Sequence, residues 1–155
     1  MLKITQTAPD FTLPGDNDAE ISLSNLRPAP VVLFFYPRDD TPGCTLEARD
    51  FTRLLPEFKA LGAEVFGISK DNIAKHCKFR DKHDLAVTLL SDADSDTCEN
   101  YGVWGEKSMY GKSFMGITRC TVLIDAKGEI AQIWPKVKVD GHAKEVLLAL
   151  RNLPA

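Results

Sequence analysis

The spacing of hydrophobic residues changes from strand-like to helix-like within the first third of the chain. Val31 to Tyr36 is a continuous apolar run rich in β-branched and aromatic residues, which is typical of a strand covered on both faces. From Pro42 onward, apolar residues recur about every 3.6 positions, which predicts a helix. Cys44 lies on the same stripe and should therefore point inward. Pro56 interrupts the pattern, so we expect a kink or break there, and Gly62 should end the helix. The other residues of the stripe are Ala48, Phe51, Leu55, Phe58 and Leu61.

Shorter apolar runs and turn residues divide the rest of the chain into strands and helices. The alternating segments 11–13 and 20–23 predict a short hairpin, and 24–30 a loop with room for one helical turn. The segment 102–116 has weak periodicity and should form a long loop that covers the functional site. Further strands are predicted at 64–69, 88–91, 118–124 and 129–134, and helices at 72–83, 94–101 and 141–152.

This order of elements predicts an α/β fold. A βαβ unit, a further βα unit, an antiparallel hairpin and a closing helix follow one another, as in thioredoxin-like proteins. We expect a central mixed β-sheet flanked by helices on both faces, with an N-terminal β-hairpin. In such open sheets, functional groups gather beyond the carboxyl ends of the strands, which is where Cys44 follows the strand 31–36.

Composition and charge narrow the class of protein. The chain has 155 residues, of which 44% are hydrophobic and 26% charged, which suits one globular domain spanning 1–155. The formal net charge is -3 and there is no basic block, so we expect no nucleic-acid partner. No apolar run reaches the length of a membrane span, and residues 1–6 lack the core of a signal peptide. The expected location is the cytoplasm.

The cysteine and histidine pattern gives no sign of a metal site. Of the four cysteines, none lies in a CxxC, and in a cytoplasmic chain they are expected to be thiols. The three histidines form no HxxxH or HExxH pattern. His76 and Cys77 are adjacent in a predicted helix, so their side chains should point about 100° apart. We therefore expect no metal and no other cofactor.

Cys44 occupies a position that favours an ionised thiol. Thr41 and Pro42 are typical of a helix start, with a hydroxyl N-cap and proline at the first helical position. Cys44 is then the third helical residue, where free N–H groups and the helix dipole favour an anion. A free cysteine with a pKa near ~8.5 is only about 3% thiolate at pH 7, and a helix N-terminus with a cationic partner greatly increases that fraction. Cys44 is thus a candidate nucleophile. The alternative is a small buried residue in the first turn.

The residues around Cys44 match a known family. The pattern Pro37-x-x-x-Thr41-x-x-Cys44 is the peroxiredoxin signature, and the run Tyr36 to Thr45 resembles the branch called peroxiredoxin Q or bacterioferritin comigratory protein. The resemblance extends in order over nearly the whole chain. The other matching segments are 9–11, 91–92, 101–107, 109–112, 116–119 and 137–142.

The resemblance implies a thiol peroxidase that reduces hydrogen peroxide and organic hydroperoxides. Cys44 would attack the distal peroxide oxygen and become a sulfenic acid. Pro37 would shield the thiolate from water, and the Thr41 hydroxyl would bond the sulfur and the incoming peroxide. Arg119 would supply the cation that favours the thiolate and steadies the charge that moves along the S–O–O line. The alternative for Arg119 is an ordinary surface arginine.

The sequence says less about the roles of three other residues, Glu47, Cys120 and Cys98. Glu47 matches a polar position of the branch and either tunes the site by hydrogen bonding or, as an acid in the first turn, stabilises the helix dipole. If Arg119 faces the site, strand alternation places Cys120 on the opposite side, where it would fill the core. Cys98, in the short helix at 94–101, has the same expected role.

The sequence departs from its relatives at the resolving cysteine. Many members of the branch carry one five positions after the first cysteine, where this chain has Arg49, and others carry it at the position of Arg80. Cys77 lies one helical turn before Arg80 and is a candidate replacement, although both helix ends would have to unwind for it to reach Cys44. Otherwise the enzyme is of one-cysteine type.

The resemblance also implies partners. Thioredoxin, glutaredoxin or glutathione would return the oxidised cysteine to the thiol, and the branch suggests a monomer. A redox sensor or relay, in which oxidised Cys44 signals to a partner, is the alternative function. A thioredoxin-type oxidoreductase is disfavoured because there is no CxxC at the helix start.

Overall fold

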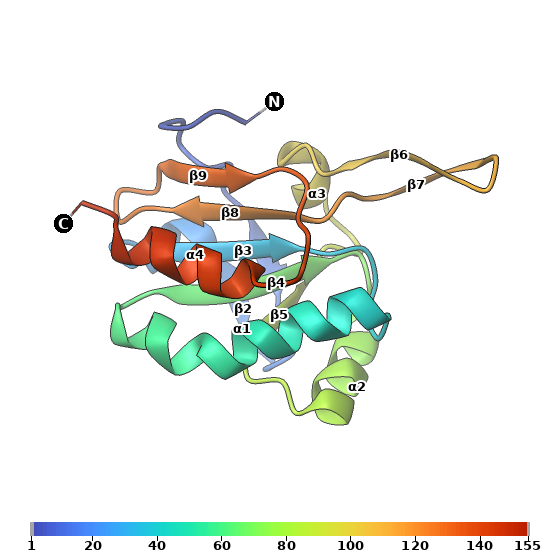
Figure 1. The fold of residues 1–155 in the computed structure, drawn as a ribbon, viewed down its shortest axis with the longest axis horizontal. Helices are drawn as coiled ribbons and strands as arrows, with labels where there is room; N and C mark the ends of the chain where they lie inside the picture. Colours follow the sequence, from blue (N-terminus) through green and yellow to red (C-terminus); the bar gives the residue numbers. More distant parts are fainter. Residues whose placement is uncertain (1, 155) are drawn as a thin grey trace.

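A five-stranded mixed sheet forms the centre of the molecule (Figure 1). The computed structural model describes residues 2–154, so Met1 and Ala155, the ends of the predicted domain, lie outside the described part. The strand order is β5-β4-β3-β8-β9, with β3 parallel to β4, β4 parallel to β5, and the pairs β3–β8 and β8–β9 antiparallel. The predicted mixed sheet is confirmed. The strands are β3 (Val31–Phe35), β4 (Glu64–Ser69), β5 (Thr88–Ser91), β8 (Cys120–Ile124) and β9 (Ile130–Trp134).

Helices cover both faces of this sheet, as predicted. Alternate residues of β3 belong to two separate buried clusters, because successive side chains of a strand point to opposite faces. The Val32 and Phe34 side packs against the three longer helices, and the Leu33 and Phe35 side packs against short N-terminal elements and α3. The helices are α1 (Pro42–Ala60), α2 (Ile73–His83), α3 (Thr97–Asn100), α4 (His142–Arg151) and the 3-10 turn η1 (Leu23–Leu26).

Several local predictions hold. β1 (Thr12–Pro14) and β2 (Glu20–Ser22) form the expected N-terminal hairpin. Gly62 has a φ of 76° just beyond the end of α1, a left-handed conformation that glycine adopts without strain. The helix predicted at 72–83 is α2, and the structure adds its cap: the side chain of Asn72 accepts a hydrogen bond from the Lys75 amide at 2.9 Å.

Of the kink or break expected at Pro56, the break is wrong, because α1 continues from Pro42 to Ala60. Phe51 and Phe58 are fully buried on either side of the exposed proline. The Phe51 ring stacks on Phe34 of β3 with 4.6 Å between the ring centroids. This packing outweighs the local cost of the missing N–H.

The predicted loop over 102–116 is also wrong. β6 (Trp104–Met109) and β7 (Lys112–Ile117) pair as an antiparallel hairpin around a two-residue turn, Tyr110-Gly111, whose φ angles are 54° and 77°. In Figure 1 this hairpin extends away from the sheet and does not cover it. Most of its residues are exposed or half-buried, so its strands lack the hydrophobic alternation by which strands are predicted.

Smaller differences concern element ends. The helix predicted at 94–101 is limited to α3, and the strand predicted from residue 118 begins at Cys120. Within residues 2–154, none of the helices combines the length and the apolar character that a bilayer crossing requires.

Candidate active site

Cys44 lies in the first turn of α1, where the chain leaves the carboxyl end of β3. It is the third residue of the helix, after Pro42 and Gly43, and Thr41 is the N-cap. The side chain is 1% exposed and belongs to the buried cluster of Phe34 and its neighbours. The thiol therefore points inward beside the positive end of the helix dipole, as its place on the hydrophobic stripe predicts.

Arg119 is the charged partner that the fold brings to this thiol. Its Nη2 donates to Cys44 Sγ at 3.4 Å, and its Nη1 donates to Glu47 Oε1 at 2.8 Å. Arg119 precedes β8, and β8 reaches the site because Cys120 pairs with Phe35 across the antiparallel β3–β8 ladder. A Cβ atom at Gly43 would lie 3.1 Å from Arg119 Nη2, so the glycine lets the guanidinium approach the helix start closely.

Glu47 forms part of this site and is not a surface acid of the first turn. It is 1% exposed, and its second oxygen, Oε2, is buried without a hydrogen-bond partner among residues 2–154. Burial raises the pKa of Glu47 from its ordinary value to about 7, and the charge and hydrogen bond of Arg119 only partly oppose this. Burial tends to lower the pKa of Arg119, but the charges of Glu47 and Cys44 outweigh it and raise that pKa. The guanidinium is therefore a permanent cation between two acidic groups.

Thr41 and Pro37 flank the cysteine from the loop before α1. Thr41 has the predicted N-cap position, but its hydroxyl makes no side-chain cap; Oγ1 donates instead to the Arg38 carbonyl at 3.0 Å. This bond closes the loop on itself. Pro37 is half-buried at the end of β3. The expected contacts of Thr41 with the sulfur and with a peroxide, and the shielding by Pro37, stay predictions.

The other three cysteines lie in different surroundings, and all four are free thiols. Cys120 and Cys44 belong to the clusters on opposite faces of the sheet, as strand alternation predicts. Burial raises the pKa of Cys120 to about 12, and it raises that of Cys98 further. Cys77 is half-buried on α2, where Sγ lies 3.7 Å from the Asp16 carbonyl oxygen in the turn between β1 and β2. Its role as a resolving cysteine stays a prediction.

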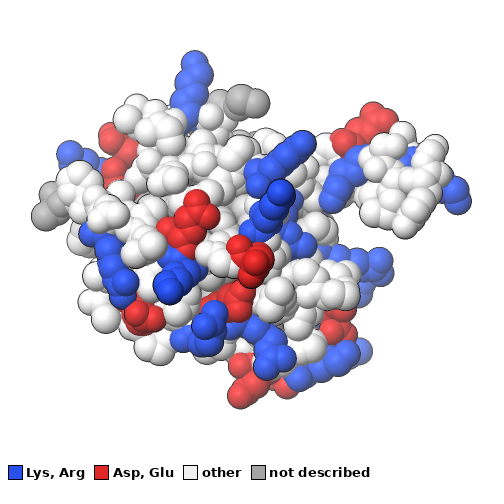
Figure 2. Space-filling model, viewed as in Figure 1, with Lys and Arg blue, Asp and Glu red and all other residues white. Residues whose placement is uncertain are grey.

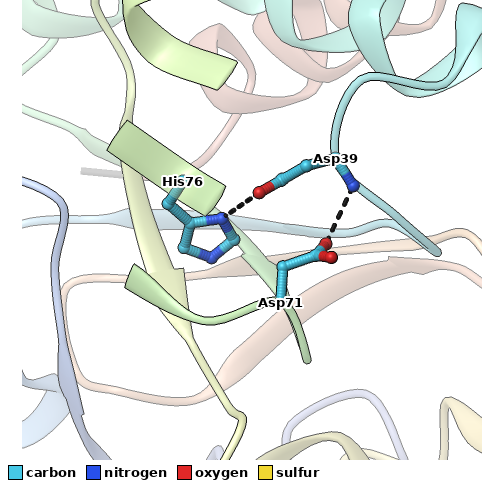
Figure 3. A group of neighbouring side chains, drawn as sticks. All are labelled: Asp39, Asp71 and His76. Atoms are coloured by element: carbon cyan, nitrogen blue, oxygen red, sulfur yellow. Dashed lines mark hydrogen bonds and ion pairs between the residues drawn. The ribbon is translucent and has the colours of Figure 1, made fainter. Parts of the chain in front are cut away.

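A second polar cluster lies behind the loop and has no counterpart in the sequence analysis. Figure 3 shows Asp39, Asp71 and His76, with His76 Nδ1 2.6 Å from Asp39 Oδ2 and the Asp39 amide donating to Asp71 Oδ2 at 2.8 Å. Tyr36 donates its hydroxyl to Asp39 Oδ1 at 2.6 Å. The sequence offered one indication of this cluster. Asp39 follows β3 and Asp71 follows β4, and parallel neighbouring strands bring the segments that follow them to one edge of the sheet.

This cluster also contains the donor atoms of a potential cation site. One ring nitrogen and two carboxylate oxygens lie within 4.8 Å of one another, a combination that divalent metals accept. The groups already satisfy each other, however, because the Asp71 carboxylate accepts from the Asp39 amide and from Ser69 Oγ, while Asp39 accepts from Tyr36 and faces His76. We therefore assign no metal to it.

A surface hollow beside α1 is separate from the thiol. It is lined by Thr45, Leu46 and Arg49 of α1 and by His83 of α2, among others, but not by Cys44. Thr45 and Arg49 are one turn apart on the outward side of the helix, whereas Cys44 and Ala48 are buried on the inward side. The hollow therefore does not open onto the sulfur.

Comparison with known proteins finds similar sequences over most of the chain. Residues 4–133 match the model of the AhpC/TSA family. The chain is 49% identical to the putative peroxiredoxin bcp of Coxiella burnetii over 146 residues, which is 94% of this chain and 97% of that protein. It is 43% identical to the peroxiredoxin Bcp of Bacillus subtilis over 152 residues, 98% of this chain and 97% of that one.

The fold has equally similar solved counterparts. A structure of the bacterioferritin comigratory protein of Xanthomonas campestris, studied for its alkyl peroxide reduction activity, superposes with a TM-score of 0.88. The two sequences are 40% identical, and the match covers 97% of this chain and 96% of that one. The relatives thus span nearly the whole chain, and the family match covers the five-stranded sheet but ends before α4. The chain belongs to the AhpC/TSA family, as a peroxiredoxin of the bacterioferritin comigratory protein, or peroxiredoxin Q, branch.

Proposed function

We propose that this thiol-dependent peroxidase reduces hydroperoxides through Cys44, with Arg119, Thr41 and Pro37 completing the site and Glu47 supporting it. The observation that carries the proposal is the 3.4 Å contact between Arg119 Nη2 and Cys44 Sγ in the first turn of α1. A cation and a helix N-terminus act together on this sulfur, and both favour the thiolate, which is the reactive form.

The reaction balances with these groups alone. The thiolate of Cys44 attacks the distal oxygen of the hydroperoxide, the S–O bond forms, and the O–O bond breaks. The cysteine becomes a sulfenic acid. The departing alkoxide or hydroxide takes a proton from solvent, which balances the proton that the thiol released on ionising, and leaves as an alcohol or as water. Two electrons pass from sulfur to the peroxide, so neither a metal nor an organic cofactor takes part in the proposed step.

Each neighbour has a role that follows from its position. Arg119 is fixed by its bond to Glu47, so its remaining donors stabilise the charge as it spreads from sulfur to the leaving oxygen. Thr41 turns its hydroxyl from the Arg38 carbonyl toward the peroxide when substrate arrives. Pro37 has no N–H and keeps water from the sulfur. The reported activity of the Xanthomonas campestris relative toward alkyl peroxides supports organic hydroperoxides as substrates beside hydrogen peroxide.

Recycling needs a second thiol. If Cys77 resolves the sulfenic acid, its sulfur displaces water and forms a Cys44–Cys77 disulfide, which thioredoxin then reduces. Otherwise thioredoxin, glutaredoxin or glutathione attacks the sulfenic acid directly. The positions that carry the resolving cysteine in many relatives hold Arg49 and Arg80 here. The remaining candidates are the three other cysteines, all of which the structure describes, and of these only Cys77 is not buried.

The proposed setting is a monomer in the cytoplasm. Four free thiols suit a reducing compartment. Figure 2 shows acidic and basic side chains interspersed on the face that carries α1 and α4. This mixed surface supports the expectation that the partners are peroxides and thiols and not nucleic acid.

The Cys44→Ser variant tests the assignment. It should lose peroxide consumption over many turnovers with thioredoxin or glutathione as reductant, while Cys120→Ser, the buried thiol on the opposite face, should keep it. Sustained turnover in the wild-type chain would separate a peroxidase from a sensor that is oxidised once. Retained activity in Cys44→Ser would end the assignment.

Intact mass after one equivalent of peroxide tests the resolving cysteine. If Cys77 resolves Cys44, the wild-type chain should lose two hydrogens, and Cys77→Ser should instead gain one oxygen as a trapped sulfenic acid. A wild-type chain that gains one oxygen under the same conditions would place the enzyme in the one-cysteine class.

A further inference from the structure

His76 is a fully buried histidine whose two ring nitrogens both face acceptors. The side chain is 0% exposed, with Nε2 at 3.0 Å from the Leu90 carbonyl oxygen and Nδ1 at 2.6 Å from Asp39 Oδ2. A carbonyl only accepts, so Nε2 carries a hydrogen. Two heavy atoms at 2.6 Å also require a hydrogen between Nδ1 and the carboxylate. Because imidazole is the stronger base of the two, with an ordinary pKa of about 6.5 against about 3.9 for aspartate, the ring is an imidazolium.

The surroundings of the ring favour this charge. Burial by itself lowers the pKa of His76, but the hydrogen bond and charge of Asp39, the Leu90 carbonyl and the charge of Asp71 outweigh it and raise that pKa above its ordinary value. Other ionisable groups near the cluster include Tyr36, which donates to Asp39, the Asp16 carboxylate, and Lys75, which lies 4.0 Å from Asp71. A surface hollow that Asp39 and Asp71 help to line is also lined by Arg38, Lys78, Asp81 and Lys82.

Asp39 connects the buried His76 ring to the loop that precedes Cys44. It lies in the loop between β3 and α1, and three groups hold it: Tyr36 and His76 through its side chain, and Asp71 through its amide. The next residue, Asp40, has a φ of 59° and accepts hydrogen bonds from Lys82 and His83 at the other end of α2. Helix α2 therefore binds two successive residues of the loop, one in the interior and one at the surface.

The loop in turn sets the first turn of α1. Asp39 is followed by Asp40 and then by Thr41, the N-cap of the helix that carries Cys44. The Thr41 hydroxyl closes the loop onto Arg38. A shift of the loop would move the start of α1, and with it the sulfur, relative to Arg119, which enters from β8 on the other side of β3.

We propose that His76, as a buried imidazolium joined to Asp39 and to the Leu90 carbonyl, is a positioning residue that fixes the 37–41 loop and thereby holds Cys44 against Arg119. The inference rests on the proposed function of Cys44 and extends it to a residue on another helix. Loss of one proton would leave a neutral ring with a hydrogen on only one of its two nitrogens, so the ring could no longer donate to both Asp39 and the Leu90 carbonyl, and its hold on the loop would weaken. The positioned state is thus present at low pH and is lost as the pH rises through the raised pKa of His76.

The first experiment compares His76→Gln with Lys78→Gln, which changes an exposed residue of the same helix. At pH 7, His76→Gln should reduce hydrogen peroxide at least tenfold more slowly than the wild-type chain, and Lys78→Gln should stay within twofold. The pH profile for alkylation of Cys44 by iodoacetamide, read by mass at that residue, should move upward in His76→Gln only.

Alkylation does not depend on peroxidase activity, so the two proposals fail separately. A His76→Gln chain with the wild-type peroxide rate and alkylation profile overturns the positioning role and leaves the assignment of Cys44 intact. A Cys44→Ser chain that still reduces peroxide overturns the function instead.

Nuclear magnetic resonance of the wild-type chain decides the matter if His76→Gln does not fold. With nitrogen-15 in the histidine rings, His76 should show two protonated nitrogens at pH 7 and should titrate above the ordinary histidine range. A ring that loses its proton at or below about pH 6.5 overturns the inference.

Discussion

A single guanidinium serves two acidic groups at the reactive centre. Arg119 donates to the sulfur of Cys44 and to the buried carboxylate of Glu47. The carboxylate fixes the direction of the arginine, and it also competes with the sulfur for the positive charge. The charge on Glu47 therefore affects how strongly Arg119 can stabilise a thiolate at Cys44.

Removing the cation should lower reactivity strongly. We expect Arg119→Ala to slow peroxide reduction about 100-fold or more, since the loss of one well-placed donor to a developing charge commonly has an effect of about 10²–10³. The alkylation profile of Cys44 should move to higher pH. Stopped-flow kinetics with hydrogen peroxide measure the first effect. Arg49→Ala, which removes an exposed arginine from the outward side of α1, is the matched control and should behave as the wild-type chain.

Glu47 gives the folding free energy a dependence on pH near neutrality. Its pKa is about 7 in the folded chain against an ordinary value of 4.5, so the folded state holds more protons between these values. The free energy of unfolding therefore falls as the pH rises through this window. At about 1.4 kcal/mol for each pH unit, the total fall is about 3 kcal/mol.

The Glu47→Gln variant should abolish that dependence. Glutamine keeps an oxygen that accepts from Arg119 but cannot ionise, so urea unfolding at pH 5 and pH 8 should give closer midpoints in the variant than in the wild-type chain. Equal differences in the two chains would show that Glu47 does not titrate in this range.

At this scale the sequence predicts the residues that the family resemblance includes, Arg119 among them, and misses contacts that lie outside the resemblance. Cys44 and its inward direction follow from its place in the first turn and on the stripe. His76 could not be paired with Asp39, because 37 positions separate them and neither helical nor strand periodicity connects the two segments. Glu47 stayed undecided because burial, which determines its protonation, is a property of the packed helix.

Among the elements, α1 shows how tertiary packing overrides a local signal. Pro56 removes one hydrogen bond from the helix interior, yet α1 runs unbroken from Pro42 to Ala60, with Phe51 and Phe58 fully buried on its inward face. The missing hydrogen bond therefore remains as a local free-energy cost within the helix.

Replacing the proline should release this cost. Pro56→Ala restores an N–H that can donate to the Thr52 carbonyl, so we expect the free energy of unfolding to rise by about 1–2 kcal/mol, the propensity gain being reduced by the greater freedom of the unfolded chain. Thermal unfolding measures the change. Pro42→Ala, at the first helical position where no N–H is needed, should show no such gain. A lower melting temperature in Pro56→Ala would contradict this explanation.

Prediction succeeded for elements with at least one buried face and failed for the β6–β7 hairpin, which buries little. Strands β4 and β5 were predicted to the residue because each is an apolar run bounded by turn residues. The β6–β7 hairpin was missed because Tyr110 at its tip is 96% exposed and the strands around it bury little. Periodicity reports burial, so an exposed hairpin leaves little pattern to detect.

Across the whole molecule, the sheet connects the site to the core. Phe34 of β3 stacks on Phe51 of α1, and Gly67 of β4 makes room for the Phe34 ring, since a Cβ atom there would lie 2.7 Å from its Cζ. The helix that carries Cys44 therefore packs on an aromatic layer. The position of the Phe34 ring in that layer depends on the absence of a side chain at Gly67 of β4.

Filling that space should destabilise the fold. We expect Gly67→Ala to lower the free energy of unfolding by about 1–3 kcal/mol, because overpacking forces a shift of the buried ring. Gly105→Ala, at a strand position where a Cβ atom meets nothing within 4 Å, should change stability by less than about 0.5 kcal/mol. Denaturant midpoints measured side by side provide the comparison, and equal midpoints for the two variants would contradict the packing argument.

The pairing of Phe35 with Cys120 has an evolutionary consequence. Neighbouring side chains at the start of β8 face opposite sides of the sheet, so a change of length before β8 that made this strand slip by one residue against β3 would remove the guanidinium from its place beside Cys44. Changes of length should therefore be tolerated at the tip of the β6–β7 hairpin, in steps of two residues, and be lethal to catalysis a few residues further along.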